Sequence, residues 1–361
     1  MTPLRVGIIG CGNISGAYFD ADAHHDAFEV VACADRSPAD AEQAAAAHDV
    51  EPLGVDELLT DDRIDAVVNL TPPTVHASVT RRALRAGNHV YSEKPLATTV
   101  SEAEEIQQLA ADRGLRVGVA PDTFLGRALQ TCRVAIDDGR IGTPHGATVV
   151  WTSLGHESWH PNPDLFYERG GGPLFDVGPY YLTALVFLLG PVHNVTGAVT
   201  QAEDERTIGN GPREGESIPV SVPTHETGTL TFESGAVASV TASFDVQGSS
   251  LPSPAFEIYG TEGTLRVPDP NHFDGDVVVI RGDERSTVSK SHPYDGGRGA
   301  GIADLARGIA GDWEHRTSVA LGAHVLETMA GVRESAEREE TVEVASSPPQ
   351  PAPVPESFPN E

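Results

Sequence analysis

Short apolar runs alternate with helical stretches through the first third of the chain. Predicted helices, one of them rich in alanine, separate apolar runs at residues 4–10, 28–34, 65–70, 88–92 and 115–119. Strands that alternate with helices are typical of β-α-β units, whose strands pair in parallel. The pattern predicts an α/β fold that begins with a doubly wound parallel sheet of the Rossmann type. Ser101, followed by Glu104, predicts a capping box for the helix at residues 101–113.

The order of predicted helices and strands changes after about residue 121. Predicted elements are a helix at residues 125–138, a strand at 145–154, a loop rich in proline, glycine and aromatic residues at 155–173, and an apolar helix up to 189. Consecutive β-rich runs then follow at residues 192–200, 226–232, 236–244, 255–259, 264–267 and 277–280, before two helices near 302–310 and 319–338. Consecutive strands indicate a mostly antiparallel, open sheet, so this region is predicted to be an α+β domain.

A length of 361 residues suits two domains better than a single core. The predicted boundaries give a Rossmann domain at residues 1–122 and an α+β domain at residues 123–345. The last stretch, residues 346–361, is polar and rich in proline. Such a composition favours a disordered tail.

The charge balance excludes several kinds of partner. The chain carries 53 acidic and 24 basic residues, for a formal net charge of −29. Nucleic acids and anionic membrane surfaces both require basic patches, so neither is an expected partner. An acidic surface of this kind stays hydrated in molar salt, which favours a halophilic protein. The alternative is a GC-rich genome that replaces lysine with arginine, since Lys94 and Lys290 are the only lysines.

Cysteine usage and apolar runs point to the cytoplasm. Cys11, Cys33 and Cys132 are odd in number, far apart and without a CxxC pair. They suggest neither a disulfide framework nor a zinc site, and no metal is expected. No apolar run has the length of a membrane span, and the N-terminal run is too short for a signal peptide.

The sharpest local motif is a glycine-rich turn after the first predicted strand. Gly10, Gly12 and Ser15 form a G-x-G-x-x-S pattern at the start of a helix. Gly10 permits a tight turn, and Gly12 allows the backbone to approach a pyrophosphate at the helix N-terminus. Ser15 stands where the fingerprint has Gly or Ala and is small enough for close packing. The turn, including Asn13 and Ile14, is therefore predicted to bind a dinucleotide.

Asp35 supports this prediction from the end of the second apolar run. It follows the glycine turn by about 20 residues, where an acidic side chain binds the adenosine ribose hydroxyls. An acid at this position favours NAD, because it would repel a 2′-phosphate. Arg36 leaves NADP open as the alternative, since its side chain can stack on adenine or pair with that phosphate. The other reading of Asp35 is an ordinary turn residue.

Further candidate cofactor-binding residues follow the third and fourth predicted strands. Thr71 and Pro72 follow the third strand and are expected to border the dinucleotide. His76 lies slightly further on, as a cofactor contact or simply as a residue of the helix N-terminus. The predicted cofactor site thus comprises Gly10, Gly12, Asn13, Ile14, Asp35, Arg36, Thr71, Pro72, His76, Glu93 and Lys94.

Lys94 is the first catalytic candidate. Glu93-Lys94-Pro95 ends the fourth strand, and Pro95 keeps Lys94 extended at the carboxyl edge of the sheet. Burial and a nearby positively charged nicotinamide are expected to lower the pKa of this lysine. It would then exchange a proton with a substrate hydroxyl during hydride transfer. The alternative is a surface lysine.

A second candidate segment, residues 170–181, places three glycines before an apolar helix. Asp176 falls in the first helical turn, where the helix dipole stabilises a carboxylate. Tyr180 follows one turn later on the same face. The two side chains are suited to binding a polyol or a carbonyl. Alternatively, Asp176 only stabilises the helix and Tyr180 belongs to the core.

Together these motifs resemble the glucose–fructose oxidoreductase, inositol dehydrogenase and MocA family. The resemblance rests on the glycine turn, on Glu93-Lys94-Pro95 and on residues 170–180, and it extends to about residue 345. It implies that Lys94 and Asp176 are catalytic or bind substrate. The histidine of the family's D-x-G-x-H pattern, often the acid–base, is replaced here by Tyr180. Tyr180, His156 or His160 would then transfer the proton, and His160 is the histidine included in the predicted site.

The resemblance implies an NAD(P)-dependent dehydrogenase or reductase that acts on a sugar, a cyclitol or a related polyol. Lys94 would handle the hydroxyl proton, and Asp176 would orient the substrate and Lys94. The second domain would bind substrate and mediate assembly into homodimers or tetramers. Two alternatives stay open: a non-catalytic sensor of dinucleotide and sugar, and a glycosidase or lyase that holds NAD tightly and oxidises its substrate transiently.

Overall fold

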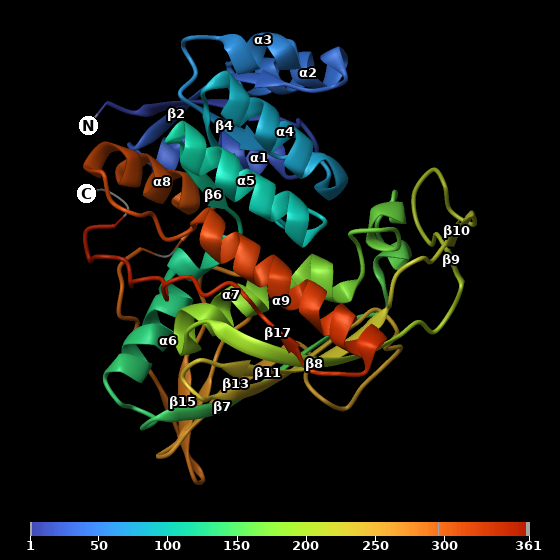
Figure 1. Ribbon diagram of the computed structural model, residues 1–361, viewed down its shortest axis with the longest axis vertical. Helices are drawn as coiled ribbons and strands as arrows, with labels where there is room; N and C mark the ends of the chain where they lie inside the picture. Colours follow the sequence, from blue (N-terminus) through green and yellow to red (C-terminus); the bar gives the residue numbers. More distant parts are fainter. Residues whose placement is uncertain (1, 295, 359–361) are drawn as a thin grey trace. The chain divides into compact units, whose positions relative to one another are not determined.

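The computed structural model describes residues 2–294 and 296–358, and it divides the chain into two compact units (Figure 1). The first unit comprises Met1–Gly126, Tyr294–Ala323 and Pro351–Glu361, and the second comprises Arg127–Pro293 and His324–Gln350. Each unit is therefore assembled from separate segments. The predicted boundaries placed residues 294–323 in the second domain, whereas the structure places them in the first unit.

The first unit contains a six-stranded sheet in which every pairing is parallel, with the order β3-β2-β1-β4-β5-β6. Its strands are β1 (Leu4–Ile9), β2 (Phe28–Ala34), β3 (Glu51–Pro52), β4 (Ala66–Asn69), β5 (His89–Ser92) and β6 (Val117–Val119). Its helices before residue 126 are α1 (Ser15–Phe19), η1 (Asp22–His24), α2 (Pro38–His48), α3 (Val55–Thr60), α4 (Pro73–Ala86), α5 (Val100–Arg113) and η2 (Thr123–Leu125). The order reverses between β1 and β4, as in doubly wound nucleotide-binding sheets, and confirms the predicted fold class.

Local signals in the sequence define several of these helix ends. The Ser37 side chain accepts a hydrogen bond from the Asp40 amide at the start of α2, and Gly87 ends α4 in a left-handed conformation. The predicted capping box for α5 was misplaced by two residues. The helix begins after Thr99, whose hydroxyl accepts from the Glu102 amide, because Thr99 has the extended backbone that an N-cap requires.

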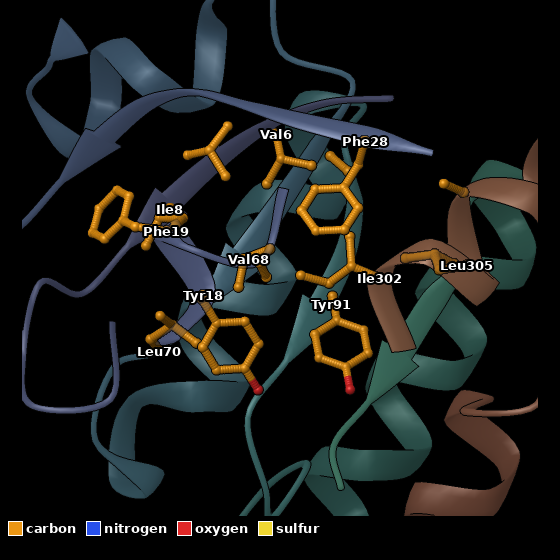
Figure 2. Close-up of a cluster of buried hydrophobic side chains, with 14 of the residues drawn as sticks. Val6, Ile8, Tyr18, Phe19, Phe28, Val68, Leu70, Tyr91, Ile302 and Leu305 are labelled. Atoms are coloured by element: carbon orange, nitrogen blue, oxygen red, sulfur yellow. The ribbon is translucent and has the colours of Figure 1, made fainter. Parts of the chain in front are cut away.

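A helix from the C-terminal half of the chain completes the core of the first unit. Figure 2 shows Ile302 and Leu305, from α8 (Ala300–Gly311), packed with side chains of the sheet and of α1. Tyr18, Tyr91 and Phe28 are among the largest fully buried side chains of this cluster. Because this packing joins side chains from residues 6–120 to side chains from residues 302–306, no local pattern reveals it.

The C-terminal segment is also packed, contrary to the predicted disordered tail. Ser346 donates to Glu327, and the Arg316 guanidinium donates to the carbonyl oxygens of Ala352 and Pro353. The side chains of Val354 and Phe358 are buried within the first unit. Composition alone suggested disorder, but two apolar side chains and a row of backbone acceptors suffice to hold this proline-rich segment.

The second unit is built on a nine-stranded sheet with the order β16-β15-β14-β13-β7-β12-β11-β8-β17. Its strands are β7 (Pro144–Thr152), β8 (Val192–Thr200), β11 (His225–Phe232), β12 (Val237–Ser243), β13 (Ala255–Gly260), β14 (Thr264–Arg266), β15 (Val278–Arg281), β16 (Glu284–Thr287) and β17 (Val342–Glu343). β7 and β12 pair in parallel, and the other neighbours are antiparallel. The prediction of a mostly antiparallel sheet is confirmed.

The remaining elements of the second unit cover or border this sheet. They are α6 (Arg127–Asp137), η3 (His156–Ser158), η4 (Asp164–Phe166), α7 (Pro173–Leu189) and a small sheet of β9 (Glu205–Thr207) and β10 (Ser217–Pro219). α7 is almost entirely buried and packs on β7, β11 and β12. Val332 of α9 (Val319–Arg338) lies against Gly197 of β8 and Gly228 of β11, and a Cβ on Gly197 would overlap the Val332 backbone carbonyl. Among the described residues, no helix is long and apolar enough to cross a membrane.

Candidate active site

The residues predicted to bind the dinucleotide gather at one edge of the parallel sheet. Gly10 follows β1, Asp35 follows β2, Thr71 follows β4 and Lys94 follows β5. Parallel strands end at a common edge, so these four positions lie on the side of the sheet where doubly wound folds bind ligands. The structure therefore brings together, within the first unit, residues spread over more than eighty positions.

Gly10 and Gly12 play different parts in the turn after β1. Gly10 has a φ of +106°, and a Cβ there would lie 2.8 Å from the Leu70 backbone, so only glycine fits without strain. A Cβ on Gly12 would meet nothing within 4 Å, because it would point into open space. Ser15 closes the turn, since both its amide and its hydroxyl donate to the Gly12 carbonyl, at 3.0 and 2.7 Å.

The Asp35 carboxylate also braces this turn. Its Oδ2 accepts from the Cys11 amide at 2.9 Å, and its Oδ1 accepts from the Ser37 amide at 2.9 Å. Each carboxylate oxygen has a second lone pair, so the side chain keeps the capacity to accept from ribose hydroxyls. Arg36, next to it, is exposed.

This edge fits a dinucleotide. Gly12, Asn13 and Ile14 are exposed where the chain enters α1, so their backbone amides are accessible to a pyrophosphate. The open space at Gly12 allows close approach, and Asp35 supplies the acceptor for a ribose diol. These residues would hold the phosphates and the adenosine ribose of NAD.

Glu93 holds the backbone of Lys94 in place. Its Oε1 accepts from the Tyr18 hydroxyl at 2.7 Å, and its Oε2 accepts from the Lys94 amide at 2.9 Å. Burial alone would raise the pKa of Glu93, but Arg298, Lys94 and the Tyr18 hydrogen bond hold it below its usual value. Both carboxylate oxygens of Glu93 are thus engaged by the protein, and one of them holds the Lys94 backbone.

A second buried carboxylate lies behind this edge. Asp122 is fully buried and accepts from the Arg298 guanidinium at 3.3 Å and from the amides of Gly299 and Gly301 at 3.1 Å. Burial raises the pKa of Asp122, although Arg298 and the Gly301 amide oppose the rise. Asp122 thus anchors the segment that leads into α8.

The polar atoms of the Thr71 and His76 side chains already contact other groups of the protein. Thr71 donates from its amide and its hydroxyl to the Asn69 side chain, while the neighbouring Pro72 is exposed. The His76 ring is buried, with Nδ1 2.7 Å from the Pro95 carbonyl and Nε2 2.6 Å from the Thr71 carbonyl. A ring whose two nitrogens both face backbone carbonyls has no polar atom left for a cofactor, so His76 does not suit the predicted role of a cofactor contact.

In the second unit, Asp176 is paired with a histidine of the preceding loop. The His156 Nε2 lies 2.6 Å from the Asp176 Oδ2, and both side chains are largely buried. His156 follows Gly155, which has a φ of +97°. The sequence left Tyr180, His156 and His160 open as the proton-transfer group, and the structure brings His156 to Asp176.

Aromatic rings surround His156. Its ring lies 4.2 Å from that of Phe166, 4.7 Å from Phe244 and 5.2 Å from Trp159, between ring centroids. Trp159 is 56% exposed, which leaves much of its surface accessible to a ligand. The His160 Nδ1, in contrast, accepts from the Asn162 amide at 3.1 Å. Burial lowers the pKa of His160.

A charged network supports the loop that carries His156. Glu157 accepts from the Tyr167 hydroxyl and from Arg206, and Arg206 also pairs with Asp245. Tyr167 is fully buried, and burial raises its pKa beyond its usual value. The loop is therefore tied to β9 and to the end of β12, rather than lying loose on the surface.

A second charged pair holds the glycine turn before Asp176. α7 begins at Pro173 without a side-chain cap of its own, and the fully buried Glu226 accepts from the Leu174 amide at 2.9 Å. Arg333 binds Glu226 at 2.7 Å and donates to the Gly171 carbonyl at 2.8 Å. Glu226, from β11, thus acts as an N-cap supplied from a distant strand.

Tyr180 lies one turn after Asp176 on α7 and is buried. The neighbouring Tyr181 donates to Asp269. Sequence reasoning missed the supporting residues Tyr18, Glu226, Arg298 and Arg333. Each acts across more than fifty residues of sequence, so no local motif indicates its partner.

The fold and the nucleotide edge define an NAD-binding Rossmann oxidoreductase. Residues 4–120 match the family model described as "Oxidoreductase family, NAD-binding Rossmann fold", and residues 129–266 match the GFO/IDH/MocA C-terminal domain. The chain therefore belongs to the glucose–fructose oxidoreductase, inositol dehydrogenase and MocA family, as the sequence motifs predicted.

Named relatives include enzymes that act on sugars. A dTDP-3,4-didehydro-2,6-dideoxy-alpha-D-glucose 3-reductase of Saccharopolyspora spinosa is 34% identical over 274 residues, covering 73% of this chain and 74% of that protein. A 1,5-anhydro-D-fructose reductase of Ensifer adhaerens is 30% identical over 269 residues, covering 72% and 74%. The apo form of levoglucosan dehydrogenase superposes with a TM-score of 0.83 at 25% identity, over 96% of this chain and 100% of that one. The match to an uncharacterized oxidoreductase of Schizosaccharomyces pombe spans only 64% of that protein.

Proposed function

We propose that this protein is an NAD(P)-dependent dehydrogenase or reductase that acts on a CH–OH or carbonyl carbon of a sugar, cyclitol or related polyol. The observation that carries the proposal is the shared sheet edge at which the glycine turn, Asp35 and Lys94 meet. The substrate class is supported by the relatives named as sugar reductases and by the dehydrogenase of an anhydrosugar. NAD is favoured over NADP because Asp35 faces the turn.

The bound nicotinamide supplies the hydride acceptor or donor. Lys94 extends from the carboxyl end of β5, and Glu93 holds its amide. An amine at this position donates a proton to the developing alkoxide in reduction and accepts it in oxidation. We assign this proton transfer to Lys94.

We assign substrate binding to Asp176, with His156 as the residue that holds its carboxylate. A carboxylate accepts hydrogen bonds from sugar hydroxyls, and the 2.6 Å contact with His156 fixes its orientation. The exposed face of Trp159 suits stacking on a sugar ring. Tyr180 and His160 remain the further candidates for the proton-transfer role that the family gives to a histidine.

The proposal is tested by measuring the absorbance of reduced nicotinamide while the protein is incubated with sugars, anhydrosugars and cyclitols. Each compound is tested with NAD and with NADP. Turnover by the wild type that disappears in Lys94→Ala supports the proposal. Dinucleotide binding without turnover of any panel member contradicts it and favours a sensor, or an enzyme that keeps NAD bound and oxidises its substrate transiently. The latter would convert a glycoside with no net formation of NADH.

We also propose that the protein works in the cytoplasm at high salt. The net charge of −29 supports this, because salt screens the self-repulsion of an acidic surface. The thiols of Cys11, Cys33 and Cys132, which are free in the structure, suit a reducing compartment. Activity and ellipticity measured from low salt to molar KCl test the proposal, and full retention of both at low salt contradicts it.

We further propose that the protein forms a homodimer or tetramer through the open face of the nine-stranded sheet. Thr227 and Thr241 lie half-buried on strands β11 and β12, and Val237 is 43% exposed. A broad sheet face with few charges suits association with a second copy. Light scattering after size-exclusion chromatography measures the assembly, and a monomeric mass contradicts the proposal.

A further inference from the structure

The backbone on both sides of Lys94 is anchored to neighbouring elements of the first unit. The Glu93 amide donates to the Asn69 carbonyl at the end of β4, at 2.9 Å. On the other side, the Pro95 carbonyl lies 2.7 Å from Nδ1 of His76, in the first turn of α4. Lys94 therefore lies between two anchor points, of which one is a side chain.

The His76 ring bridges two strand ends. It is 1% exposed, and its Nε2 lies 2.6 Å from the Thr71 carbonyl, just after β4. The fully buried Asn69 fixes the same helical turn, because its side-chain amide donates to the His76 carbonyl at 3.0 Å and to the Thr80 hydroxyl at 3.1 Å. The position of the ring is thus determined by the surrounding protein and not by a ligand.

Only one of the two ring contacts is next to Lys94. Burial lowers the pKa of His76, although the two carbonyls and Glu93 oppose the shift. The neutral ring has a single N–H and donates to one carbonyl at a time. Donation from Nδ1 holds Pro95, whereas donation from Nε2 holds Thr71.

We propose that His76 is a positioning residue for Lys94, and that its Nδ1–H holds the Pro95 carbonyl and so fixes the backbone from which the lysine extends. The consequence for turnover rests on the proposed function, because it requires Lys94 to transfer the proton. The positioning itself is a property of the protein without substrate. The two are therefore tested by separate readouts.

Two conservative substitutions separate the two ring contacts. The amide nitrogen of asparagine reaches the place of the histidine Nδ1, so His76→Asn keeps the contact with Pro95 and loses that with Thr71. Glutamine reaches the place of Nε2, so His76→Gln does the reverse. A buried histidine elsewhere in the first unit, His315, serves as the matched control, because its Nε2 likewise lies beside a backbone carbonyl, that of Val117, at 3.1 Å.

The small number of lysines makes Lys94 directly observable. The chain contains two lysines, Lys94 and Lys290. Reductive methylation with ¹³C-formaldehyde keeps their charge and gives each a resolved methyl signal in a carbon–proton correlation spectrum. Lys94→Arg assigns the signal of Lys94, and Lys290, which pairs with Asp274, is the internal reference. The remaining methyl signal belongs to the N-terminal amine.

We expect the Lys94 signal to keep its position in His76→Asn and in His315→Asn, and to shift or broaden in His76→Gln, with the Lys290 signal unchanged throughout. We expect kcat on the substrate found in the panel to fall about tenfold in His76→Gln and less than about threefold in His76→Asn, because misplacing a catalytic group slows turnover. The Kd for NADH, measured by fluorescence, should stay within about threefold of the wild type in both variants.

A Lys94 signal that stays unchanged in His76→Gln, or that moves equally in all three variants, overturns the proposal. A rise of tenfold or more in the Kd for NADH with an unchanged Lys94 signal also overturns it, because His76 would then act on the cofactor. If no panel member is turned over, the proposed function fails, while the methyl signals still decide the positioning.

Discussion

The two units hold their functional side chains by different physical means. In the first unit the chain's own backbone does most of the positioning: Gly10 makes the turn, and the Cys11 and Lys94 amides bind the carboxylates of Asp35 and Glu93. In the second unit, Glu226 and Arg333 fix the start of α7, and the Glu157, Arg206 and Asp245 side chains fix the loop of His156.

The difference indicates how each unit fails when it is altered. A site defined by backbone geometry fails when a Cβ is added or an amide is misplaced. A site defined by buried charges fails when one charge loses its partner, because a buried, unpaired charge costs several kcal/mol. The predictions below exploit this contrast, from the largest expected effect to the smallest.

Lys94→Ala tests the proposed proton-transfer group of the first unit. We expect kcat to fall by about 10²- to 10⁴-fold, the range that a positioned proton donor contributes. The Kd for NADH should change little, because the phosphates and the ribose bind at the glycine turn and Asp35. Lys290→Ala is the control and should keep full activity. Steady-state kinetics and NADH fluorescence measure the two effects, and an active Lys94→Ala enzyme would remove Lys94 from the mechanism.

Glu226→Ala tests the second unit. Glu226 is fully buried against Arg333, so its removal should lower the free energy of unfolding by about 3–5 kcal/mol, as for other broken buried pairs. Glu226→Leu combined with Arg333→Met removes both charges and should cost less. Urea unfolding measures both variants. A double variant less stable than Glu226→Ala would contradict this expectation, because the unpaired Arg333 charge would then not be the main cost.

Gly10→Ala and Gly12→Ala compare two glycines of the same turn. The alanine at position 10 meets the Leu70 backbone at a φ of +106°, and strain of about 1–3 kcal/mol or more should lower the stability of the first unit. The alanine at position 12 points into open space, so stability should stay unchanged while the Kd for NADH rises about tenfold. Equal loss of stability in both variants would contradict the assigned roles.

Acid sensitivity is a further property of the first unit. Burial lowers the pKa of His25 to about 4 and that of His315 to about 4. Because the folded-state pKa lies below the unfolded value, each neutral histidine contributes stability that is lost as the pH falls from about 6.5 towards 4. Between pH 7 and pH 5 the loss should be about 2 kcal/mol for each residue. His315→Asn should reduce this pH dependence, whereas His272→Asn, at an exposed site, should not; identical pH profiles for all three proteins would contradict the assignment.

The sequence predicts features that depend on neighbouring residues, and it fails for features that depend on contacts between distant segments. The Rossmann sheet, the glycine turn, Asp35 and the position of Lys94 follow from local patterns, since each depends on residues close together in the chain. The nine-stranded sheet was predicted as mostly antiparallel, but the parallel pairing of β7 with β12 leaves no local signal.

The remaining errors and gaps share one cause. The contact between His156 and Asp176 depends on how the loop folds over twenty residues. The return of α8 to the first unit and the burial of Val354 and Phe358 depend on packing between distant segments. The place of His76 after β4 suggested a cofactor contact, whereas in the structure both ring nitrogens lie beside backbone carbonyls.

The central claim is that the protein transfers a hydride between nicotinamide and a sugar-like carbon with Lys94 as the proton-transfer group. The most direct measurement supplies NADH deuterated at nicotinamide C4 with a panel of ketoses and anhydroketoses and follows deuterium into the product by mass spectrometry. The account predicts one deuterium on the reduced carbon with the wild type, and a rate of deuterium transfer that is lower by about 10²- to 10⁴-fold with Lys94→Ala. Binding of NADH without deuterium transfer to any acceptor, or equal transfer by both proteins, would contradict it.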